Sequence, residues 1–96
     1  MIINHLLKMM LEDDKDTVRK ECISCIELNS RTIPFVVTRS LDKSTKVRVE
    51  VYRALKCNSP VPFMELNVLD RLQLILNGLN DYEAEAKDAC REYIIS

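Results

Sequence analysis

The sequence is poor in residues that make turns, with one glycine and three prolines among its 96 residues. A β-rich fold needs many tight turns, and glycine and proline are the residues that best form them. The chain is instead rich in leucine, lysine, glutamate, arginine, methionine and alanine, which are good helix formers. We therefore expect an all-α fold.

Long apolar runs are also missing. No stretch approaches the roughly 20 apolar residues that a membrane-spanning helix needs. The N-terminal segment has no basic region ahead of its apolar residues and no small-residue cleavage site, so we expect no signal peptide. An intracellular protein without membrane association is expected, and its four cysteines should be reduced thiols.

Residues for catalysis are scarce as well. His5 is the only histidine, and no nucleophile is spaced to pair with it. Gly78 stands alone, so the chain lacks a glycine-rich loop for phosphate. We expect no enzyme activity, no cofactor and no small-molecule substrate.

The four cysteines raise the question of a metal site. Cys22 and Cys25 form a C-x-x-C pair, a spacing that suits zinc or a redox disulfide. A zinc site needs two further ligands, and neither a second C-x-x-C nor a histidine pair is present. We expect no metal, and interpret Cys22, Cys25, Cys57 and Cys90 as small core residues. The acidic segment 12–16 is better suited to helix capping than to a cation cage.

Charge is distributed unevenly around a net value of −1. Residues 31–56 hold seven basic and two acidic side chains, whereas acidic side chains outnumber basic ones in the segments before and after. Such a basic centre could meet an anionic partner, or it could be an ordinary solvated helix face. Phosphate binding needs only clustered cations. The candidates for phosphate contact are Lys43, Lys46, Arg53 and Lys56.

Three segments of the chain share one pattern. They begin at Asp13, Asp42 and Asp81, and each has an apolar residue five positions later and a cation six positions later. Each follows an apolar segment with helical spacing. The pattern indicates a repeated helix–turn–helix unit, spaced by 29 and then 39 residues. Such repeats are typical of a solenoid, since a single helical hairpin cannot bury its apolar face alone.

Each aspartate should lie in the turn, where it can accept backbone N–H bonds at the start of the second helix. Each cation can reach the aspartate of its own or a neighbouring unit, so that stacked units form a ladder. Arg39 could serve the ladder or a ligand. The predicted ladder residues are Asp13, Arg19, Asp42, Arg48, Asp81 and Lys87.

The middle unit resembles the HEAT repeat, because Pro34 is followed eight residues later by Asp42 and six further on by Arg48. In that interpretation Pro34 kinks the first helix of the pair. The sequence predicts an α-solenoid of about three HEAT-like helix pairs, the first truncated. We expect one HEAT segment, 1–96, with units at about 1–29, 30–57 and 64–96. A non-repeating helical bundle is the alternative, and the segment 32–41 could also form a strand.

The detailed order of short motifs is more specific. Val18-Arg19, Thr32 to Pro34, Arg39 to Asp42, Val47-Arg48 and Arg71 to Asp81 occur in the order found in one family. Over about residues 7–95 the chain resembles the G-type non-SMC HEAT-repeat component of condensin. That family's proteins are many times longer, so the resemblance implies a fragment of their early repeats. The acidic start of the third unit, "DYEAEAK", departs from the family and speaks against DNA contact there.

The resemblance implies a non-catalytic scaffold in mitotic chromosome condensation. Proteins of that family bind a kleisin segment and join the other condensin subunits, and with kleisin they hold double-stranded DNA. The resemblance implies the nucleus and chromosomes as the location, with a cytoplasmic pool. The alternative is a generic HEAT adaptor that binds peptides, as in transport or phosphatase scaffolds.

Overall fold

The computed structural model describes residues 2–57 and 61–95, and these contain helices and no strand, as the composition predicts. Six α-helices and two short 3-10 helices follow one another. They are α1 (Ile2–Glu12), α2 (Asp16–Cys25), α3 (Ile33–Thr38), η1 (Arg39–Leu41), α4 (Thr45–Cys57), η2 (Phe63–Glu65), α5 (Val68–Leu79) and α6 (Ala84–Ile95). None of these helices is long and apolar enough to cross a membrane.

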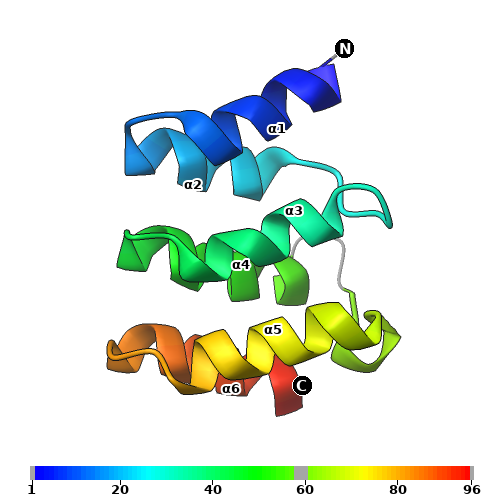
Figure 1. Cartoon of the computed structure of the whole chain (residues 1–96), viewed down its shortest axis with the longest axis vertical. Coiled ribbons are helices and arrows are strands. Elements are labelled where there is room, and N and C mark those ends of the chain that lie inside the picture. The colour runs from blue at the N-terminus through cyan, green and yellow to red at the C-terminus, as the bar shows by residue number, and fades with distance from the viewer. Residues whose placement is uncertain (1, 58–60, 96) are drawn as a thin grey trace.

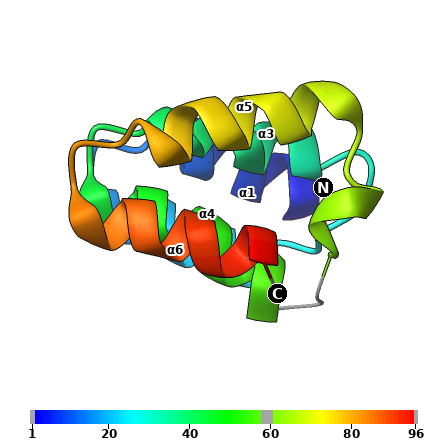
Figure 2. The same ribbon diagram turned by 90° about the horizontal axis from the view of Figure 1, so that it is seen from below.

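The helices form stacked pairs. In Figure 1, α1 and α2 lie at one end of the long axis, α3 and α4 in the middle, and α5 and α6 at the other end. Figure 2 shows that α1, α3 and α5 make one layer, while α2, α4 and α6 make the other. Helix α4 contacts both α2 and α6, and the molecule measures 34 × 26 × 21 Å. This arrangement fits the expected solenoid of HEAT-like pairs. The unit boundaries given above remain a prediction.

The core lies between the two layers. Its fully buried side chains come from all three pairs, as expected if no pair can cover its own apolar face. On α4, the stripe expected from helical spacing is buried completely, including Val47, Val51 and Leu55. The 17 buried apolar residues are Leu7, Met10, Cys22, Ile23, Ile26, Val36, Val37, Val47, Val51, Tyr52, Ala54, Leu55, Leu66, Leu74, Ala86, Cys90 and Tyr93.

The single glycine marks a close crossing of helices. A Cβ atom on Gly78 would lie 2.3 Å from the Sγ atom of Cys90 and 2.6 Å from the phenol oxygen of Tyr52. Such distances are shorter than any side chain tolerates, so only glycine lets α5 approach α4 and α6 this closely.

Pro34 does not kink a helix, which corrects the expectation from the sequence. It lies in the first turn of α3, where a missing N–H is tolerated because it has no helical partner. Thr32, fully buried, precedes it and donates from its hydroxyl to the carbonyl of Glu27 at 2.5 Å. The segment that could have been a strand is therefore helix, begun rather than bent by its proline.

Candidate functional site

The repeated aspartates each make the same turn. Asp13, Asp42 and Asp81 each accept, through Oδ1, a hydrogen bond of 2.9 Å from the backbone N–H two residues later. This Asx turn fixes each carboxylate between the two helices of its pair. The aspartates precede the second helix rather than belong to it. Their position is set by local backbone geometry and is therefore repeated in all three pairs.

Arg19 links the first pair to the second. Its Nε and Nη2 atoms donate to both carboxylate oxygens of Asp42, each at 2.9 Å. Its Nη1 atom donates to the backbone carbonyl of Asp13, in its own turn, at 2.7 Å. One guanidinium therefore holds its own turn and the next one, a geometry that suits its planar set of donors.

Arg48 repeats the same contacts one step further along the stack. Its Nε and Nη2 atoms donate to Asp81 at 2.7 and 3.3 Å, and its Nη1 atom donates to the carbonyl of Asp42 at 2.8 Å. The ring of Tyr82 also lies 5.2 Å from the guanidinium carbon. The Asp–Arg ladder therefore consists of two completed steps, Arg19–Asp42 and Arg48–Asp81.

Both steps are shielded from water. The four residues expose between 4% and 8% of their surface. Burial raises the pKa of Asp42, but the hydrogen bonds from Arg19 and from the Ser44 N–H outweigh this and hold that pKa below its ordinary value. The hydrogen bond to Asp42 raises the pKa of Arg19. Both groups are therefore charged, and neither can lose its partner without leaving a buried charge behind.

The ends of the predicted ladder differ from its middle. The Lys87 N–H bonds to the carbonyl of Glu83, as the Arg48 N–H bonds to Ser44, so its backbone has the same register. Among the described residues, however, no carboxylate forms an ion pair with Lys87 and no cation forms one with Asp13. Arg39 is placed at the ladder, with its Nη1 atom 3.5 Å from the Asp42 carboxylate.

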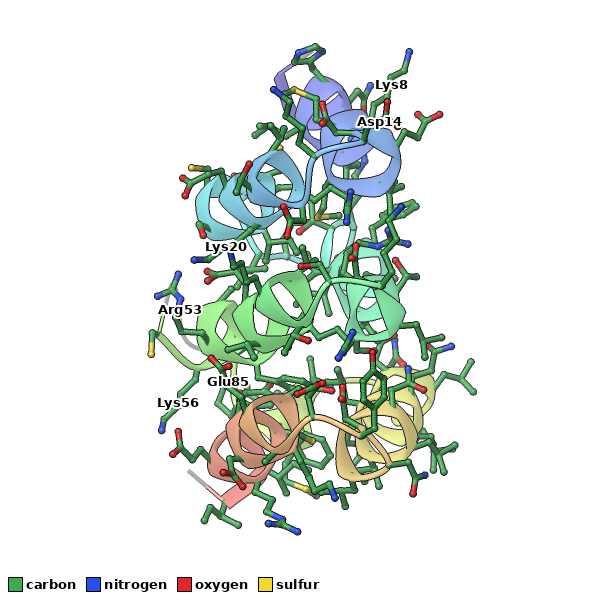
Figure 3. The ribbon with its side chains drawn as sticks, turned by 90° about the vertical axis from the view of Figure 1, so that its left-hand side faces the viewer. Lys8, Asp14, Lys20, Arg53, Lys56 and Glu85 are labelled. Atoms are coloured by element: carbon green, nitrogen blue, oxygen red, sulfur yellow. The ribbon has the colours of Figure 1, made fainter. Side chains whose placement is uncertain are left out.

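The predicted phosphate contacts lie on two surfaces. Lys46, Arg53 and Lys56 are exposed along α4, at spacings of seven and three residues that keep them on one face. Figure 3 shows Arg53 and Lys56 reaching out on the same side of the stack as Lys20. Lys43 is exposed in the turn before α4, beside a polar groove of about 300 Å³ that Asp42 also lines. The structure thus separates Lys43 from the other three.

Glu50 has a role that sequence reasoning missed. It was expected only to interrupt the basic cluster, but it is 2% exposed and packs beneath that cluster. Its carboxylate accepts a hydrogen bond from the Ser24 hydroxyl at 2.7 Å and two from Arg53 Nε at 2.9 Å. Arg53 is therefore held by an acidic partner, and Glu50 joins α4 to α2. The glutamate three residues before the arginine was the available signal, but its burial depends on how the pairs stack.

Two of the four cysteines are core residues and two are not. Cys22 and Cys90 are buried, and burial raises the pKa of each thiol. Cys25 and Cys57 are exposed, so the expectation of a core position is wrong for both. Cys25 lies at the end of the stack, where no further helix covers α2. Across the part of the chain that the structure describes, no group of three or more His, Cys, Asp and Glu side chains could hold a metal ion.

Two curated proteins match almost the whole chain. Condensin complex subunit 3 of Xenopus laevis is 28% identical over 94 residues, which are 98% of this chain and 9% of that protein. The human protein of the same name is 27% identical over 94 residues, with the same two coverages. No family model and no solved structure matches the chain. The resemblance to the HEAT-repeat component of condensin is thus confirmed, as a similarity to one short segment of much longer proteins.

Proposed function

We propose that this chain is a non-catalytic HEAT-repeat scaffold segment of a condensin complex. The observation that carries the proposal is the similarity to condensin complex subunit 3 over 98% of the chain. The stacked helix pairs and their buried ladder support it, because a scaffold must hold its surface in a fixed shape. The segment acts on chromosomes in the nucleus, in mitotic chromosome condensation.

Its proposed partners are a kleisin segment, the other condensin subunits and double-stranded DNA. A stack of helix pairs presents the extended surface that long, flexible protein segments bind. For DNA, the support is the exposed row of Lys46, Arg53 and Lys56 on α4. Cations on one face neutralise phosphates without reading base sequence, so we expect binding that is independent of sequence.

The DNA part of the proposal is tested by fluorescence-anisotropy titration with a short duplex at several salt concentrations. We expect log affinity to fall with log salt with a slope of roughly −3, as three or four phosphate contacts would give. The variant reverses Lys43, Lys46 and Lys56 to glutamate. Arg53 is left in place because its loss would leave Glu50 buried without its partner.

A matched control reverses three exposed cations elsewhere, Lys8, Lys15 and Arg91, and so changes the net charge equally. Circular dichroism confirms that all three proteins are helical. Loss of binding in the first variant but not in the control supports the basic face of α4. Equal loss in both points to net charge alone, and absence of binding at low salt rules out a DNA contact by this segment.

A generic HEAT adaptor for protein segments remains the second candidate. The specific observation in its favour is that Glu50 neutralises Arg53 in the middle of the basic row. Fewer cations are then available to phosphate than the sequence suggests. Binding to peptides together with no duplex binding at low salt would favour this candidate.

A further inference from the structure

The Asp–Arg ladder has an unfilled position at each end of the stack. Lys87 stands where Arg19 and Arg48 stand in their pairs, six residues after the aspartate and with the same backbone register. Asp13 stands where Asp42 and Asp81 stand, and makes the same Asx turn. Within residues 2–57 and 61–95, neither Lys87 nor Asp13 has an ion-pair partner. One end thus offers a cation, and the other offers a carboxylate in the matching position.

The α1–α2 end of the stack carries an apolar groove of about 350 Å³. Val18 and Cys25, which line it, are seven residues apart and share one face of α2. Arg19 and Ser24, whose side chains contact the middle pair, flank the opposite face. The groove therefore faces away from the stack. Its lining residues are Leu6, Met9, Thr17, Val18, Glu21, Cys22 and Cys25.

The α5–α6 end carries an apolar ridge. Leu72 and Leu79, also seven residues apart, are 49% and 40% exposed. They lie across α5 from Asn77, whose amide donates to Ser40 in the middle pair at 2.9 Å. The same helix exposes Leu69 and Leu76 beside them. Adjacent exposed leucines of this kind mark an interaction surface rather than ordinary scatter.

We propose that copies of this chain stack end to end, the α5–α6 ridge of one copy covering the α1–α2 groove of the next. Lys87 of one copy then pairs with Asp13 of the next and continues the ladder between molecules. The argument rests on charge complementarity and on continuity with the contacts inside the chain. Both halves of the interface belong to every copy, so assembly is head to tail and does not close into a dimer. The inference is independent of the proposed role in condensin.

Sedimentation velocity across a wide concentration range tests the proposal. We expect the sedimentation coefficient to rise with concentration without levelling at the value of a dimer. Lys87→Glu should weaken association about tenfold, as the loss of a close interfacial charge pair does. Adding Asp13→Lys should restore it, since the two charges are then exchanged. Lys46→Glu, in the middle pair, is the control for net charge and should change nothing.

A thiol reagent locates the contact in the same samples. Cys25 lies in the groove, whereas Cys57 is exposed at the end of α4. Association end to end should slow the modification of Cys25 as concentration rises and leave that of Cys57 unchanged. This readout and Lys87→Glu decide the matter even if Asp13→Lys loses its helicity. A monomer at every concentration overturns the proposal and leaves the two faces to another helical partner. Association with Cys25 unprotected overturns it as well.

Discussion

The buried ladder makes a strong prediction for Asp42→Asn. The asparagine keeps an oxygen for the Ser44 N–H but loses the charge opposite Arg19, which the structure holds with two bonds of 2.9 Å. Removing one partner of a buried pair typically costs about 3–5 kcal/mol, because the other charge stays buried. Arg19 keeps its bond to the Asp13 carbonyl, so we expect a loss near the lower end, about 3 kcal/mol.

The assay is urea unfolding followed by far-UV circular dichroism. A matched control is Asp88→Asn, which removes an ion pair with Arg91 in which both side chains are more than half exposed. Exposed pairs contribute under about 1 kcal/mol, so the control should barely move the unfolding midpoint. Arg19→Met tests the coupling: combined with Asp42→Asn, it should cost clearly less than the two single losses together. The reasoning is refuted if Asp42→Asn costs no more than Asp88→Asn.

Three further predictions follow from packing and charge. Gly78→Ala should destabilise the fold by about 1–3 kcal/mol in urea unfolding, because its Cβ would overlap Cys90. Leu74→Ala, at a fully buried position, should cost about 2–5 kcal/mol, whereas the 59% exposed Leu76→Ala should cost under about 0.5 kcal/mol; equal losses would mean that α5 is not oriented as described. Hydrogen bonds hold the pKa of Asp42 below its ordinary value despite burial, so its stabilising effect is present above the pKa of an unfolded aspartate, about 3.9, and is lost as pH falls through the lower folded pKa. The Asp42→Asn protein should therefore lose less stability over that acidic range, and an unchanged pH dependence would contradict the assignment.

Helical class and repeat were predictable because both are written in local spacing. The stripe at Val47, Val51 and Leu55 has the period of a helix, and the three aspartates recur at the same point of each unit. What could not be foreseen depends on how the pairs stack. Pro34 begins α3 instead of bending it, since the first helix of the middle pair is shorter than the repeat pattern suggested. Cys25 follows the apolar pattern of α2 but lies on a face that no neighbouring helix covers.

The same division applies to the site. The pairing of each arginine with the aspartate of the following unit was one of the two options that the spacing allowed, and the structure shows that option. The burial of Glu50, and with it the restraint on Arg53, needed the contact between α2 and α4. Net charge along the sequence therefore overstates the cations that are available to a phosphate backbone.

The central claim is that this chain works as part of condensin, and affinity purification from dividing cells tests it most directly. The tagged protein is recovered under mild salt, and its partners are identified by mass spectrometry. We predict recovery of the condensin ATPase subunits and kleisin, and a weaker yield from the Asp42→Asn variant, whose ladder is broken. Recovery of transport or phosphatase components without any condensin subunit would contradict the claim.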